Sequence, residues 1–175
     1  MKEKMSMKKN RGFTLMEVMV VVGIIGITAA IAIPNIISHL PKHRLNSGAR
    51  DVYSAMQYAR LMAIKEKTPV SINFNTGGDT FTVFSDSNAN GIIDGGDTVL
   101  KSETMPPDVD ITNATIFTGL VTWCGFNARG LPIQSRIGSV ELQSTSQNLF
   151  LKQIRLRISG STVIRTSTDG GGTWN

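Results

Sequence analysis

A long apolar run near the N-terminus constrains this chain more than any other feature. Residues 13–34 contain one ionisable side chain, Glu17, and are otherwise apolar, glycine or threonine up to the final Pro34. As an α-helix these 22 residues are about 33 Å long, which is enough to cross the roughly 30 Å hydrocarbon core of a bilayer. We therefore expect a transmembrane helix followed by a separately folded part.

The basic residues that give the chain its formal net charge of +5 are concentrated before this run. Residues 1–12 carry five basic side chains and one acidic one, whereas the rest of the chain is nearly neutral. Positive residues before a span stay on the cytoplasmic side, so the chain after the span lies across the membrane. A cleaved secretory signal is the alternative, but its small-residue cleavage site follows a shorter apolar region.

The segment RGFTLMEVMVVVGIIGITAAIAIP, residues 11–34, resembles the class III signal of type IV pilins and type II secretion pseudopilins. The resemblance implies that a prepilin peptidase cuts between Gly12 and Phe13, and that Phe13 is then N-methylated. Glu17 becomes the fifth residue of the mature chain, and Pro34 falls on the family's helix-kinking proline. Residues 1–12 are then the leader peptide and residues 13–34 the transmembrane and assembly helix.

Glu17 needs a physical explanation, because an unpaired carboxylate in hydrocarbon is costly. The resemblance implies that Glu17 of one subunit pairs with the N-terminal amine of Phe13 on its neighbour in the filament. The alternative is that Glu17, about one helical turn into the span, reaches the headgroups on the cytoplasmic side.

Residues 35–67 are expected to continue as an amphipathic helix. Apolar residues recur there at spacings of three and four, which place them on one helical face. Pro34 and Pro41 predict kinks or short breaks, and Thr68-Pro69 ends the pattern. The stripe consists of Leu45, Ala49, Val52, Met56, Ala59 and Ala63.

Residues 68–175 predict a mainly antiparallel β domain. Alternating apolar residues at 70–75 and 80–84 predict one hairpin, and those at 152–159 and 162–168 predict another. Weaker candidates for strands are 99–102, 109–112 and 121–126, and Cys124 in the last of these is expected in the core. The fold class is therefore α+β and pilin-like: a long N-terminal helix, transmembrane and then amphipathic, followed by this domain.

Three internal pieces narrow the resemblance to minor pseudopilins of the GspH and FimT type. They are YSAMQYARLMAIKEKTPVSINF, SDSNANGIIDGGDTVL and FNARGLP. The resemblance implies a structural subunit of a type II secretion pseudopilus or a type IV pilus, with other pilins or pseudopilins, prepilin peptidase and an inner-membrane assembly platform as partners. It also implies a single-pass inner-membrane protein with a periplasmic C-terminal domain, which later enters the filament. No Ser/His/Asp set, zinc pattern or dinucleotide loop points to an enzyme.

The segment DSNANGIIDGGD, residues 86–97, has the ligand spacing of an EF-hand calcium loop. Asp97 replaces the usual bidentate glutamate, however, and strands rather than helices are expected on either side. An Asn-Gly hairpin loop without an ion explains the same residues, so both interpretations stay open. The calcium ligands would be Asp86, Asn88, Asn90, the backbone carbonyl of Ile92, Asp94 and Asp97.

Two further functions are compatible with parts of the sequence. A FimT-like minor pilin that binds DNA in natural transformation would use basic residues near the C-terminus, here Arg155, Arg157 and Arg165. These arginines are not clustered and the mature chain is nearly neutral, so a solvated strand face is favoured over phosphate binding. An ordinary anchored protein with an unrelated β domain leaves Gly12, Phe13 and Glu17 unexplained.

Overall fold

The computed structural model describes residues 12–116, 122–135 and 137–175. The chain divides into two compact units, one up to His39 and one of Leu40–Asn175. The order of elements is α1 (Leu15–Glu66), β1 (Val70–Asn75), β2 (Thr80–Ser85), β3 (Thr98–Thr104), β4 (Val109–Ile116), β5 (Trp123–Phe126), the short 3-10 helix η1 (Ile133–Ser135), β6 (Gly138–Ser144), β7 (Leu151–Leu156) and β8 (Thr162–Ser167).

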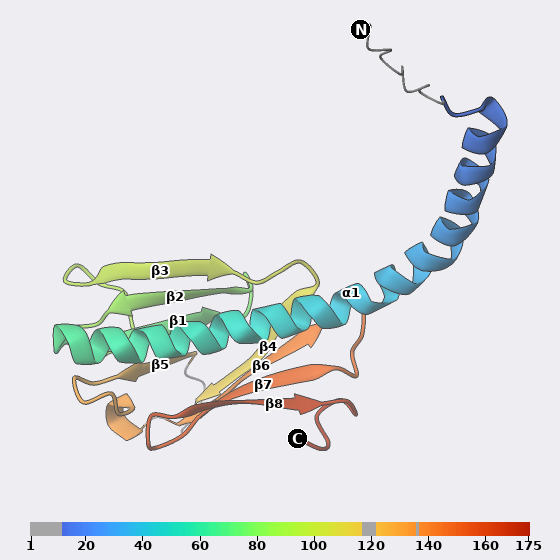
Figure 1. Ribbon diagram of the computed structural model, residues 1–175. Coiled ribbons are helices and arrows are strands. Elements are labelled where there is room, and N and C mark those ends of the chain that lie inside the picture. Colours follow the sequence, from blue (N-terminus) through green and yellow to red (C-terminus); the bar gives the residue numbers. More distant parts are fainter. Residues whose placement is uncertain (1–11, 117–121, 136) are drawn as a thin grey trace, which may run out of the picture. The chain divides into compact units, whose positions relative to one another are not determined.

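The strands form two antiparallel sheets of four strands each. One sheet has the order β3-β2-β1-β5 and the other β4-β6-β7-β8. In Figure 1 the second half of α1 runs across strands of both sheets. The α+β fold, a long N-terminal helix followed by a mainly antiparallel β domain, is confirmed.

The predicted apolar stripe of α1 forms the centre of the core. Its six residues are all buried, together with Gly48 and Ala55. They share one cluster with side chains of both sheets, such as Phe74 of β1 and Leu142 of β6. Four alanines on this face let the helix backbone approach the sheets closely, and most of the larger apolar side chains of the core come from the strands.

Both predicted hairpins are present. In β1 and β2, Val70 pairs with Ser85 and Asn75 with Thr80. The second hairpin is shorter than expected, because the chain turns at Gly160, whose φ of 77° lies in the left-handed region. The amide of Gly160 donates to the carbonyl of Arg157 at 2.8 Å. The expectation that Ile158 belongs to the strand is therefore wrong, and its side chain is exposed.

The expected short breaks at Pro34 and Pro41 are absent, since α1 is a continuous α-helix through both positions. A proline removes one backbone donor but leaves the neighbouring hydrogen bonds of the helix in place. A kink at Pro34 or at Pro41 stays a prediction. The helix ends where expected, with Lys67 in the left-handed region at a φ of 54° just before Thr68-Pro69.

Cys124 lies on β5 and is buried, as expected. Burial raises the pKa of its thiol to about 12. The thiolate is the reactive form of cysteine, so this side chain is a packing residue rather than a nucleophile.

Candidate functional site

The start of α1 is fixed by a local hydrogen bond. Thr14 precedes the helix, and its Oγ1 accepts a hydrogen bond from the Glu17 amide at 3.2 Å. This is an N-cap, which satisfies one of the amides that a helix leaves unpaired at its beginning. Gly12 and Phe13 consequently lie outside the helix, and both are exposed. This cap was not predicted from the sequence, although Thr followed by Glu three residues later is its usual signature.

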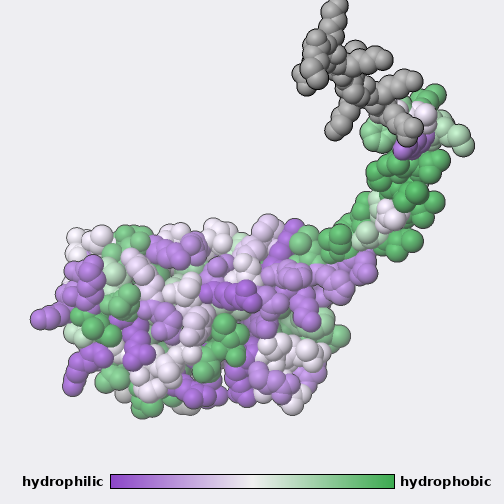
Figure 2. Space-filling view, in the orientation of Figure 1, coloured by the Kyte–Doolittle hydropathy of each residue, from purple (hydrophilic) through white to green (hydrophobic). Residues whose placement is uncertain are grey.

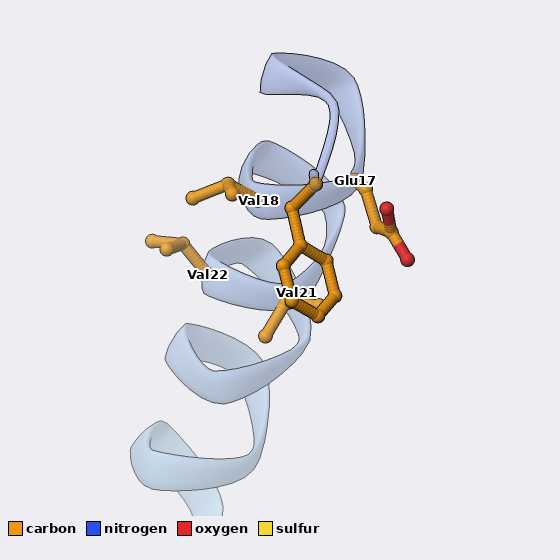
Figure 3. A pocket seen from close by; sticks show the side chains of 5 residues that line it. Glu17, Val18, Val21 and Val22 are labelled. Atoms are coloured by element: carbon orange, nitrogen blue, oxygen red, sulfur yellow. The ribbon is translucent and has the colours of Figure 1, made fainter. Parts of the chain in front are cut away.

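The Glu17 carboxylate has no hydrogen bond or ion pair with any of the residues that the structure describes. Figure 3 shows the carboxylate pointing away from the helix, with Val18 and Val22 on another side. A hollow of about 250 Å³ beside it is lined by Phe13, Glu17, Val18, Val21 and Val22. The only charge on this part of the helix is thus next to an open apolar surface.

Apart from Glu17, the first part of α1 has apolar, glycine or threonine residues on all sides. Leu15 is 80% exposed, the valines and isoleucines that follow are exposed as well, and Phe13 just before the helix is 82% exposed. Figure 2 shows this hydrophobic surface on the N-terminal part of the helix. The Thr28 hydroxyl donates to the carbonyls of Ile24 and Ile25, so it needs no water. Helix α1 is long and apolar enough to cross a membrane, and a surface of this kind is normally covered by lipid or protein.

In the 86–97 loop, Asp86 is buried and holds the loop to the first sheet. Its carboxylate accepts hydrogen bonds from the Ser71 hydroxyl at 2.5 Å and from the amides of Gly91 and Asn90 at 2.8 and 3.0 Å. Gly91 itself has a φ of 75°, and a Cβ there would lie 1.9 Å from the Trp123 indole. A side chain at position 91 therefore has no room.

The other carboxylates of this loop bind neighbouring loop donors. Asp94 accepts from the side-chain amides of Asn88 and Asn90, and Asp97 accepts from the Ser87 amide at 3.3 Å. The hydrogen bond from Asn88 is the main reason why the pKa of Asp94 is lowered. Ile92 is exposed.

The loop is thus closed by its own hydrogen bonds. Among the described residues, no three His, Cys, Asp or Glu side chains gather as metal ligands. A calcium ion at Asp86 would share a carboxylate that already accepts hydrogen bonds from Ser71, Asn90 and Gly91. Calcium binding stays a prediction, and a calcium-dependent rise in melting temperature that Asp94→Ala removes would support it.

The three C-terminal arginines have different surroundings. Arg155 on β7 and Arg157 after it are exposed. Arg165 on β8 is half-buried, and its Nη2 donates to the carbonyl of Trp174 at 2.8 Å. The chain end also pairs with β8, through two hydrogen bonds between Asn175 and Thr166. Arg165 therefore holds the C-terminal tail.

Two protein-family models match this chain. The model of the family described as "Type II transport protein GspH" matches residues 48–170, which is more than half of the chain. The model of the prokaryotic N-terminal methylation motif matches residues 7–33. The second match contains Gly12, Phe13 and Glu17.

Curated relatives match part of the chain. The type IV major pilin protein PilA of Myxococcus xanthus is 48% identical over 59 residues, which are 34% of this chain and 26% of that protein. The pilin-like protein PilA1 of Thermus thermophilus is 33% identical over 88 residues, which are 50% of this chain and 55% of that protein. The chain thus spans about a quarter to about half of the length of these relatives.

Solved structures show the same fold. The type IV minor pilin FimU of Pseudomonas aeruginosa has a TM-score of 0.57 at 14% identity, over 74% of this chain and 96% of that one. The minor pseudopilin EpsH of the Vibrio cholerae type 2 secretion system has a TM-score of 0.52 at 9% identity, over 69% and 95%. At these identities the likeness concerns the fold alone. With the family match over residues 48–170 and the methylation motif before it, the chain belongs to the GspH family of minor pilins and pseudopilins.

Proposed function

We propose that this chain is a structural, non-catalytic subunit of a type II secretion pseudopilus or a type IV pilus. Prepilin peptidase removes residues 1–12 by cutting between Gly12 and Phe13, and Phe13 is then N-methylated. Residues 13–34 anchor the subunit in the inner membrane, and residues 35–67 lead into the periplasmic β domain, residues 68–175. The inner-membrane assembly platform then adds the subunit to other pilins or pseudopilins. Membership of the family and the exposed Gly12-Phe13 bond support this proposal.

One observation carries the assembly step: the Glu17 carboxylate is unpaired among the described residues and lies on an apolar helix surface. Cleavage after Gly12 creates an amine at Phe13. In hydrocarbon a carboxylate is stabilised by a cation at close range, because the low dielectric strengthens the attraction. The amine of a neighbouring subunit supplies this cation, so the pairing favours a helix next to another helix over a helix alone in lipid.

The pairing is tested by Glu17→Gln, which keeps the size of the side chain and removes its charge. The variant is produced together with prepilin peptidase and the assembly machinery, and its amount in sheared filaments is measured. We expect normal processing and membrane insertion, with incorporation reduced at least about tenfold, equivalent to about 1.4 kcal/mol.

The matched control is Glu66→Gln, the same change at the other end of α1, where Glu66 pairs with Lys65 at 3.2 Å. This variant should assemble like the unmodified chain. Normal incorporation of Glu17→Gln would refute the pairing, whatever the processing result.

A further inference from the structure

We propose that a small basic hollow in the Leu40–Asn175 unit binds a phosphate group, such as that of an anionic lipid headgroup. The hollow has a volume of about 70 Å³, room for about two water molecules at roughly 30 Å³ each. It lies between the start of the buried half of α1 and the hairpin of β7 and β8. Its lining includes Lys42, Asn46, Phe150, Lys152, Thr166 and Thr168.

The positive charges at this hollow have no acidic partner among the residues that the structure describes. The ion pairs in that part of the chain join Lys65 to Glu66 and Lys101 to Glu103. Lys152 is half-buried, and its pKa is lowered by this burial and by the nearby charges of Lys42 and Arg50. Lys152 is therefore repelled by Lys42, which also lines the hollow, and by Arg50, which does not, and a bound anion would reduce that repulsion.

The polar groups of the hollow suit a phosphate. The Lys152 ammonium donates to Thr166 Oγ1 at 2.7 Å, so the Thr166 hydroxyl keeps its own proton for an acceptor in the hollow. The Lys42 ammonium lies 5.7 Å from the centre of the Phe150 ring, which holds it at the rim. The two lysine ammonium groups, together with hydroxyl and amide donors, exceed what one carboxylate can satisfy, and they match the several acceptor oxygens of a phosphate.

The position of Lys42 in the chain favours a lipid as the source of the phosphate. Only four residues separate it from Ile37, the last residue of the long exposed apolar stretch before Leu40. Basic residues this close to a membrane span are attracted to anionic headgroups. The choice of a lipid rests on the proposed membrane anchoring, whereas phosphate binding itself does not.

The test uses the full chain in a neutral detergent and two probes. Inorganic phosphate is compared with chloride of equal ionic strength, and phosphatidylglycerol is compared with phosphatidylcholine. The variant is Lys152→Met, and the matched control is Lys65→Met, which removes the same charge at the far end of α1. We expect phosphatidylglycerol to raise the thermal midpoint of the unmodified chain and of Lys65→Met. Lys152→Met should bind the probe at least about tenfold more weakly, because it lacks the charged donor.

Without an anion, Lys152→Met should melt no lower than the unmodified chain, because it removes a repelled charge. This readout separates anion binding from a purely structural role. If the variant does not fold, the exposed Lys42→Met takes its place with the same expected loss of binding.

The two probes separate the sources of the phosphate. A response to inorganic phosphate as well supports a site for free phosphate, and a response to phosphatidylglycerol alone supports a lipid site. Equal responses of the Lys152 and Lys65 variants, or no response of the unmodified chain to either probe, would overturn the proposal. The phosphate measurement needs neither processing nor assembly, so its failure is distinguishable from failure of the proposed function.

Discussion

The 86–97 loop depends on one residue, the buried carboxylate of Asp86. We expect Asp86→Ala to lower the free energy of unfolding by about 2–3 kcal/mol, because the Ser71 hydroxyl and the Gly91 amide lose a charged acceptor in a buried place. Urea unfolding of the full chain in detergent measures this loss. Asp94→Ala is the control, since Asp94 is exposed and its partners can turn to water. Equal losses in the two variants would show that the burial of Asp86 has no special effect.

A second residue gives a prediction about pH. The hydroxyl and amide of Ser146 and the hydroxyls of Thr145 and Ser144 donate to Asp108, and they lower the pKa of its carboxyl from 3.8 to about 2. A lowered pKa in the folded state means that the stabilisation is present above pH 3.8 and is lost as the pH falls toward 2.

Asp108→Asn should therefore show a flatter decline of the melting temperature between pH 4 and pH 2 than the unmodified chain. The control is Asp110→Asn, because burial and the nearby Asp79 and Asp108 raise the pKa of Asp110. Removing that carboxyl should not flatten the decline. Parallel curves for Asp108→Asn and the unmodified chain would contradict this account.

The buried face of α1 sets how closely the helix approaches the sheets. Ala55 is completely buried on this face, whereas the adjacent Ser54 is exposed. Ala55→Leu adds volume where none is free and should destabilise the chain by about 1–3 kcal/mol. Ser54→Leu adds the same kind of side chain to the exposed face and should change the free energy of unfolding by less than about 0.5 kcal/mol. Similar losses in the two variants, measured by urea unfolding, would mean that close packing of this face is unimportant.

The elements that the sequence predicted are those whose signals are local. In the β1-β2 hairpin apolar and polar residues alternate on both sides of Gly77-Gly78 as far as Val83, and the Asn75 side chain accepts hydrogen bonds from both glycine amides. Strand β6 was not predicted, although Val140 and Leu142 alternate with polar residues. Its alternating pattern is short and lies among serines and glutamines. The strand forms because it is buried between β4 and β7 rather than because of the β propensity of its residues.

For the sites of the whole molecule too, those whose residues are close together in the sequence could be predicted, and those assembled from distant residues could not. Gly12, Phe13 and Glu17 lie within six consecutive residues, so their motif is visible in the sequence. Lys42 and Lys152 belong to α1 and β7, so their contact depends on the folded chain. The same holds for Ser71, which lies in β1, and Asp86, which directly follows β2. The surroundings of Arg60 on α1 also depend on the folded chain, because its Nε is buried and the turns at Gly130 and Gly160 pack against the guanidinium group.

The central claim, that the chain is processed and assembled as a pilin-like subunit, is tested most directly by the N-terminal mass of the protein. The full chain is produced with and without prepilin peptidase and analysed by mass spectrometry. The account predicts an intact leader without the peptidase and, with it, a chain that starts at N-methylated Phe13. An unchanged leader in the presence of the peptidase, or a cut after Ala32 at the end of the apolar run, would contradict it.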